Sequence, residues 1–328
     1  MRWPVFAVLV SSFSVLAAEK ARLVQPQVYV GMCDASAGVA IQSNLFLVAN
    51  DEDNVLRLYR SDQPGPPAKT FDMNGFLELT GKSQEADLEG AAMLGHRVFW
   101  IGSHGRNKDG KPRPNRCRLF ATDVSFSNAE VNLTPVGRPC KSLLEDLNRD
   151  ARFKEFHLSE AAIKAPKERD ALNIEGLAAT PQGHLLLGFR NPTPGDAALV
   201  IPLLNPNEVI DGQAARFDAA IKLDLDGLGI RDLAFDGKTY FIIGGEWHSG
   251  GDFQLYRWPG PGASPKRIKV AHLNRYSPEA IVLYPSPESG YRFQILSDDG
   301  TRPVEGVSCK ELSDPEHQTF RSCWVAFE

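Results

Sequence analysis

Five segments of the sequence share one pattern, and this repeat limits the fold more than any other feature. Each segment has a polar or acidic start, a short apolar run, a tight turn, a second apolar run and a polar end, which is typical of a β-hairpin. The segments start at Asp34, Asp87, Asn173, Ile230 and Pro278. Long internal repeats of this kind are typical of propeller blades.

Two further apolar runs follow most of these hairpins, as "VLRLYR" and "AKTFDM" follow the first. Four antiparallel strands make one blade, so we predict an all-β fold, a β-propeller of five four-stranded blades. Six blades remain open as an alternative, because two long segments interrupt the repeat. A β-sandwich also has short strands and tight turns, but it does not explain the repeated polar start.

The two chain ends are expected to close the ring. The fifth unit has only one further strand, "SCWVAFE", and we expect residues 22–30 to supply the missing outer strand beside it. The larger interruption, residues 141–172, predicts a short helical insertion. Ser142 and Glu145 have the spacing of a capping box at its start.

The first 18 residues have the pattern of a signal peptide, with Arg2, an apolar segment and small residues before Glu19. A membrane anchor is the alternative, but the apolar segment is shorter than the roughly 20 residues that span a bilayer. We therefore expect residues 19–328 to form a single propeller domain that is periplasmic or secreted, has no membrane span and is a monomer. The net charge of −5 and the lack of a Lys/Arg cluster argue against nucleic acid as a partner.

Five cysteines in an exported chain suggest two disulfides and one leftover thiol. A hairpin centred on Asn128 and Ala129 would place Cys117 opposite Cys140, which predicts a bridge between them. Cys309 and Cys323 would then close a short loop, leaving Cys33 single. A reduced, cytosolic chain without bridges is the alternative.

The charged ends of the hairpins point to a site. In a hairpin, the start of the first strand lies beside the end of the second, and the first strand of each blade lines the propeller channel. We therefore expect the polar ends to meet around the channel mouth. The carboxylates assigned there as metal ligands are Asp51, Asp53, Asp87, Glu89, Glu175, Glu279, Asp298 and Asp299.

Carboxylates that are crowded together need a positive charge to balance them. A calcium-type ion, which takes six to eight oxygen ligands, is one candidate. Arg106, Arg190 and Arg231 are the other, since they can pair with the acids or bind an anion. In a third interpretation, the glutamates only accept hydrogen bonds from loop amides, and Gly90 and Gly176 allow the chain to pack closely near the axis. These glutamates are Glu89, Glu175 and Glu279.

At these residues the sequence resembles a known family. The segments "WIGSHGRNKDG" and "IEGLA", with "GFRNP" after the latter, are similar to the bacterial exported family called domain of unknown function 3616, over roughly residues 30–300. This resemblance implies a propeller-like fold but no established reaction. The "DLEG" and "IEGLA" motifs also resemble exported esterase-like phytase propellers, which implies a cation-assisted phosphoester hydrolase.

Two functions follow as hypotheses. In the first, the protein is an exported hydrolase of phosphoester or other ester substrates, assisted by a divalent cation. Arg106, Arg190 and Arg231 would act on a small anionic ligand, and His104 would serve as the acid. In the second, it is a non-catalytic propeller that binds a ligand or an envelope component. No nucleotide-binding or redox motif is present, so we expect Ca²⁺ but no nucleotide or redox cofactor.

Overall fold

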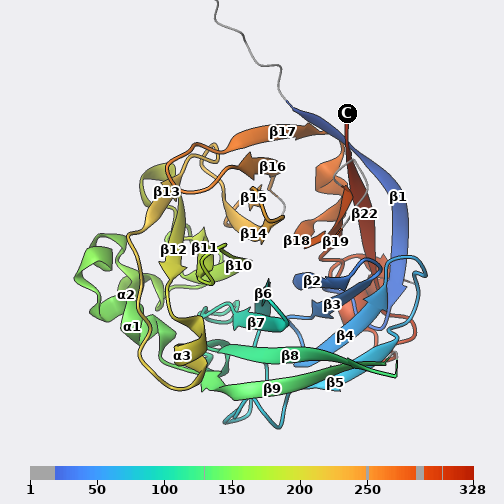
Figure 1. Cartoon of the computed structure of the whole chain (residues 1–328), viewed down its shortest axis with the longest axis horizontal. Coiled ribbons are helices and arrows are strands. Elements are labelled where there is room, and N and C mark those ends of the chain that lie inside the picture. The colour runs from blue at the N-terminus through green and yellow to red at the C-terminus, as the bar shows by residue number, and fades with distance from the viewer. Residues whose placement is uncertain (1–18, 129, 249–250, 286–291, 305) are drawn as a thin grey trace, which may run out of the picture.

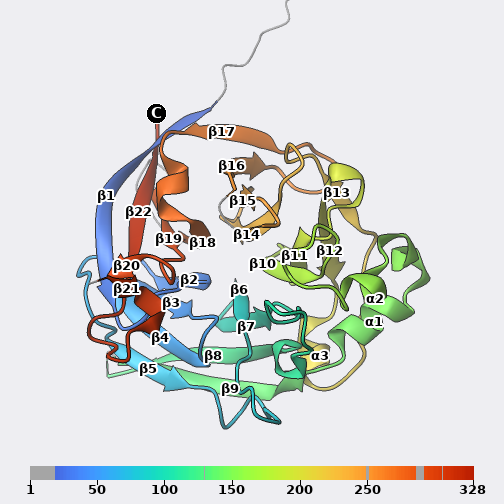
Figure 2. The same cartoon turned by 180° about the vertical axis from the view of Figure 1, so that it is seen from behind.

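The strands are arranged as five blades around one axis in the computed structural model, which describes residues 19–128, 130–248, 251–285, 292–304 and 306–328 (Figures 1 and 2). The strands of the first blade are β2 (Ala37–Gln42), β3 (Leu45–Ala49), β4 (Val55–Arg60) and β5 (Lys69–Asp72). Those of the second are β6 (Leu88–Leu94), β7 (Arg97–Gly102), β8 (Leu119–Ser127) and β9 (Glu130–Cys140). Those of the third are β10 (Asn173–Ala179), β11 (Leu185–Asn191), β12 (Ala198–Leu203) and β13 (Ile221–Leu223).

The last two blades are joined along their outer edges. The fourth consists of β14 (Gly229–Phe235), β15 (Tyr240–Gly245), β16 (Phe253–Trp258) and β17 (Lys266–Val270). The fifth consists of β18 (Pro278–Leu283), β19 (Arg292–Ser297), β22 (Thr319–Phe327) and β1 (Lys20–Val30). A short parallel pairing of β1 with β17 links the two blades into one eight-stranded sheet. The prediction of five blades is therefore confirmed.

The N-terminal strand closes the ring. β1 pairs antiparallel with β22 from Ala21 opposite Phe327 to Val30 opposite Thr319, although these residues lie at the two ends of the chain. The expectation that residues 22–30 supply the outer strand of the last blade is confirmed. The expected signal peptide, residues 1–18, lies outside the described residues.

The core is divided among the blade interfaces. Five clusters of buried apolar side chains each join two neighbouring blades. Alternate residues of one strand serve different clusters: Leu47 of β3 packs towards the second blade, whereas Phe46 and Val48 pack towards the fifth. Because successive side chains of a strand point to opposite faces, every blade buries both faces and depends on both neighbours.

The insertion is helical, as expected, and packs against the second and third blades. It contains α1 (Leu143–Arg149), η2 (Ala151–Phe156) and α2 (Leu158–Ala161), whose apolar residues join the cluster between these blades. The expected capping box does not form, because Ser142 makes no side-chain capping bond and Glu145 pairs with Arg149.

Short elements complete the structure. They are the helices α3 (Pro206–Ile210), η1 (Pro114–Arg116), η3 (Pro194–Asp196), η4 (Leu273–Tyr276) and η5 (Cys309–Glu311), and the strands β20 (Pro303–Val304) and β21 (Val307–Ser308). No helix in the described part of the chain is long and apolar enough to cross a membrane.

Both predicted disulfides are wrong. Cys33 is bonded to Cys309, and Cys117, Cys140 and Cys323 are free thiols. The hairpin of β8 and β9 does pair in the expected register from Ser127 opposite Glu130 to Ala121 opposite Val136.

An irregularity in β9 then separates the two expected partners. Beyond Val136 the strand bulges at Gly137, whose φ is 64°, so that Cys140 lies opposite Leu119 rather than Cys117. Cys323 lies inside β22 opposite Ile295, among the apolar residues between the fourth and fifth blades.

Deleting residues 19–30 should make the protein aggregate. The deletion uncovers the hydrogen-bonding edge of β22, and an open strand edge pairs with other chains. Size-exclusion chromatography and thermal unfolding would measure this. The substitution Val28→Lys is the matched control, since this side chain is 50% exposed and the variant should behave as the parent. A soluble, equally heat-resistant deletion variant would contradict the closure.

Breaking the disulfide should lower stability. It joins residues 276 positions apart, so it restricts the unfolded chain strongly, and Cys33→Ser should reduce the free energy of unfolding by about 2–4 kcal/mol. Denaturant titration of both proteins measures this change. Alkylation in denaturant without reductant should label Cys117, Cys140 and Cys323 only; a labelled Cys33 would show that the bond is absent.

Candidate functional site

Four blades carry a charged residue at the same place in their innermost strands. Near the start of β6, β10, β14 and β18, the pairing with the second strand is irregular and leaves one residue unpaired. These residues, which we call the axial charge ring, are Glu89, Glu175, Arg231 and Glu279. A β-bulge re-aims the side chain of its extra residue, so one local irregularity repeats around the axis. In the first blade, the matching place before β2 holds the buried, uncharged Ser36.

Glycines allow these strands to approach one another. A Cβ atom on Gly90 would lie 2.9 Å from the Cβ of Leu177 in the next blade, and one on Gly176 would lie 2.7 Å from Ile230 Cγ2. The innermost strands contact one another in the ring order β2, β6, β10, β14, β18 (Figure 1). Gly90 and Gly176 are therefore required for packing, as one interpretation of the sequence had it.

Arg231 joins two glutamates of the axial charge ring. Its Nη1 lies 2.9 Å from Glu175 Oε2, and its Nη2 lies 2.9 Å from Glu279 Oε1. Burial alone would lower the pKa of Arg231, but the carboxylates of Glu175 and Glu279 raise it above its usual value. Arg190 Nη1 contacts Glu175 Oε1 at 2.7 Å. Arginine side chains therefore pair with Glu175 and Glu279, as one of the hypotheses drawn from the sequence expected.

A second group of acids lies where the first and second blades meet. Single oxygens of Asp51, Asp87 and Glu89 lie within 4.8 Å of one another, and the same holds for Asp34, Asp51 and Glu52. We call these five residues the acidic cluster. Asp34 precedes β2, Asp51 and Glu52 follow β3, and Asp87 and Glu89 begin the second blade. The start of β2 and the end of β3 thus lie side by side, as we expected for the two strands of one hairpin.

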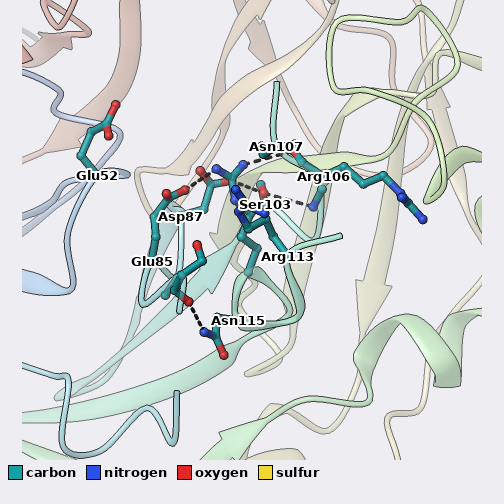
Figure 3. A network of polar contacts seen from close by, with 12 residues as sticks. Glu52, Glu85, Asp87, Ser103, Arg106, Asn107, Arg113 and Asn115 are labelled. Carbon is teal, nitrogen blue, oxygen red and sulfur yellow. Dashed lines mark hydrogen bonds and ion pairs between the residues drawn. The ribbon is translucent and has the colours of Figure 1, made fainter. Parts of the chain in front are cut away.

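Only part of the acidic cluster is neutralised. Arg116 Nη1 donates to Asp87 Oδ2 at 2.8 Å, and the Ser103 hydroxyl donates to the same carboxylate (Figure 3). Glu52 pairs with Lys310. In the described part of the chain, the carboxylates of Asp34, Asp51 and Glu89 have no Lys or Arg partner. These buried carboxylates must therefore be neutralised either by protonation or by a bound cation.

The environment of the cluster disfavours ionisation. Burial raises the pKa of Asp51 and of Glu89 well above their usual values, and neighbouring carboxylates raise both further. Burial also raises the pKa of Asp87 to about 7, although Arg116 and Ser103 oppose the shift. Moreover, one oxygen of Asp34 and one of Asp51 are buried without a hydrogen-bond partner among the described residues. These atoms are free to accept a proton or bind a cation.

Of the other predicted metal ligands, Asp298 contacts the acidic cluster, whereas Asp53 and Asp299 pair with arginines. Burial raises the pKa of Asp34, and its protonated carboxyl donates a hydrogen bond to Asp298, which helps to hold the pKa of Asp298 below its usual value despite its burial. Asp53 pairs with Arg57 at 2.7 Å, and Asp299 pairs with Arg321 at 2.6 Å. Of the eight predicted ligands, the structure brings together Asp51, Asp87 and Glu89.

The predicted acid and one predicted arginine are differently placed. His104 is buried with its Nδ1 2.7 Å from the Gly102 carbonyl oxygen, and burial lowers the pKa of its ring to about 4. Arg106 donates to the carbonyl oxygens of Ala162 and Gly110, and it points away from Asp87 (Figure 3). It therefore ties the helical insertion to the second blade.

Sequence reasoning missed Arg116, which holds both Asp87 and Glu85. This arginine lies between two strands, outside the repeated hairpins, and no spacing rule points to it. The bulges were missed as well, but their signal is present. A charged residue is the second or third residue of four of the five hairpins, from Glu89 to Glu279.

Comparisons with known proteins agree with this fold. The model of a family described as "Protein of unknown function (DUF3616)" matches residues 34–123 and 127–280, which is more than half of the chain. A search of the curated proteins found no match.

Among solved structures, glutaminyl cyclase from Myxococcus xanthus is similar, with a TM-score of 0.51 and 11% identity over 95% of this chain and 98% of that one. The PQQ-bound aldose sugar dehydrogenase from Streptomyces coelicolor has a TM-score of 0.46 and 10% identity, over 95% of this chain and 99% of that one. Similarity at this level of identity concerns the fold alone. Because the family model matches more than half of the sequence, the chain belongs to the family described as Protein of unknown function (DUF3616).

Proposed function

We propose that the protein is an exported propeller that binds a divalent cation of the calcium type in the acidic cluster and uses it to hydrolyse an ester or phosphoester. The observation that carries this proposal is the convergence of Asp51, Asp87 and Glu89 within 4.8 Å, beside buried carboxylate oxygens that have no partner in the described structure. The disulfide between Cys33 and Cys309 supports export, because such bonds persist in oxidising compartments.

The donor set suits a hard cation. Calcium takes six to eight oxygen ligands, and the acidic cluster offers carboxylates from Asp51, Asp87 and Glu89, with Asp34 and Glu52 next to them. Burying several carboxylates without balancing charge is costly, which favours a bound cation over an empty cluster. A divalent ion held here would polarise a substrate oxygen and lower the pKa of bound water.

The axial charge ring supplies the other groups. Glu279 keeps one oxygen on Arg231, while its second oxygen has no hydrogen bond among the described residues. Burial raises the pKa of Glu279 to about 8, although Arg231 opposes the shift, so this carboxyl can exchange a proton near neutral pH. Arg190 and Arg231 hold the glutamates in place rather than a substrate. Their proposed role is therefore positioning.

Calcium should raise the melting temperature of the parent protein, and a chelator should reverse the effect. A ligand that binds only the folded state adds about 2.7 kcal/mol at 100 times its Kd, which corresponds to a shift on the order of 5 °C. Differential scanning calorimetry with and without calcium measures it. A parent protein that does not respond to calcium would disprove the cation site.

Two isosteric variants separate the acidic cluster from the arginine pairs. Glu89→Gln should abolish the calcium response, since it removes a charge that the ion needs. Glu175→Gln should keep the response but lower the free energy of unfolding by about 3 kcal/mol, because Arg190 and Arg231 lose a buried anionic partner. The same calorimetry applies to both. The reverse pattern would place the cation at Glu175.

Turnover requires a separate test. A screen of generic phosphoesters, carboxylic esters and lactones should show a calcium-dependent hydrolysis that is lost in Asp51→Asn and in the presence of a chelator. Calcium binding without any hydrolysis would reject the catalytic part and favour the alternative, a propeller that binds a ligand or an envelope component.

A further inference from the structure

One surface pocket is lined by basic side chains but by no acidic ones. Two loops, residues 80–83 and 112–115, line a surface pocket of about 520 Å³ on the second blade. Its charged side chains are Lys82 and Arg113, and no acidic residue lines it. Within the described residues, neither side chain forms an ion pair, although the chain as a whole carries a net charge of −5. This pocket therefore has an unbalanced positive charge.

Asn115 holds the pocket in shape. This residue is 2% exposed, and its amide nitrogen donates to the carbonyl oxygens of Thr80, at 2.8 Å, and Ser83. Its Oδ1 accepts from the backbone N–H of Thr80 at 3.0 Å. One buried side chain thus fixes both ends of the loop that carries Lys82. Pro112 and Pro114 restrict the backbone on either side of Arg113.

The loop also has free backbone donors. No hydrogen bond is formed by the N–H groups of Gly81, Lys82 and Ser83 in the described structure. Gly81 has a φ of 75°, and successive N–H groups next to a left-handed residue form anion-binding concavities. Cationic side chains, hydroxyl groups and free amides together suit an anion with several acceptor oxygens, as a phosphate group has.

Arg116 connects the second loop of the pocket to the acidic cluster. Arg116 follows Asn115 directly and binds Asp87 of the acidic cluster, at 2.8 Å, and also Glu85. Glu85, Asp87, Arg113 and Asn115 belong to the one polar network drawn in Figure 3. The loop that carries Arg113 is therefore tied to the acidic cluster through the ion pairs of Arg116.

We propose that this pocket, with Lys82, Arg113 and the 81–83 amides, binds a phosphate group. Its further role, anchoring a phosphorylated substrate beside the cation, rests on the proposed function. Binding of phosphate by itself does not, because it depends only on the two loops.

Isothermal titration of the full-length protein with inorganic phosphate, in the absence of calcium, tests the pocket. The double variant K82A/R113A should weaken binding about tenfold or more, because each charged hydrogen bond contributes roughly 1.5–3 kcal/mol. The matched control is K238A/R275A, which also removes one lysine and one arginine that form no ion pair among the described residues, and it should bind as the parent does. Unchanged melting of both variants shows that they fold.

Three comparisons decide the outcome. Acetate should bind more weakly than phosphate, since a carboxylate offers fewer oxygens; equal binding would overturn the phosphate assignment. Phosphate binding that is absent in the parent, or unchanged in K82A/R113A, would overturn the pocket itself. The calcium response of K82A/R113A should equal that of the parent. The experiments can therefore disprove the phosphate pocket without disproving the cation site, and they can disprove the cation site without disproving the pocket.

Discussion

The pairing of β1 with β22 is the interaction on which the rest of the structure depends. Each blade buries apolar side chains on both faces, so an open ring would expose two of these faces to water. The strand pairing closes the ring between the two chain ends, and the bond between Cys33 and Cys309 ties the segment after β1 to the last blade. Closure also fixes how near the five innermost strands come to one another.

Because the innermost strands lie close together, side chains of like charge are crowded near the propeller axis. Four bulges direct charged side chains to one end of the ring, and three of the four are glutamates. Arg231 and Arg190 balance Glu175 and Glu279, whereas Glu89 and Asp51 have no such partner in the described structure. Buried carboxylates without a basic partner lower stability unless they hold protons or a cation balances them. The pocket formed by residues 80–83 and 112–115 has the opposite imbalance, since Lys82 and Arg113 line it and no acidic residue does.

Features that follow from a repeated local pattern were predicted correctly, whereas specific side-chain partners were not. Hairpins, blade number and the closing strand were predicted correctly because they follow from local alternation and a repeated unit. The bridge between Cys117 and Cys140 failed because the bulge at Gly137 changes the register close to the end of β9. The capping box failed because Glu145 found another partner in Arg149. The bridge between Cys309 and Cys323 failed because Cys309 is bonded to Cys33, 276 positions away, a contact that spacing in the sequence does not predict.

The sequence alone determined the propeller, because its hairpin pattern is repeated five times, and the closure, because the fifth unit lacks one strand. It also indicated the end of the axis where charge collects, since four of the five hairpins carry a charged residue at their second or third position, near that end. Only the tertiary structure decided which charges neutralise one another. It paired Arg231 with Glu175 and Glu279, and it directed Arg106 towards the insertion. It also brought Arg116 from a connecting loop to Asp87. Ion pairing depends on atomic distances between residues far apart in the chain, and these distances are set by blade packing rather than by spacing in the sequence.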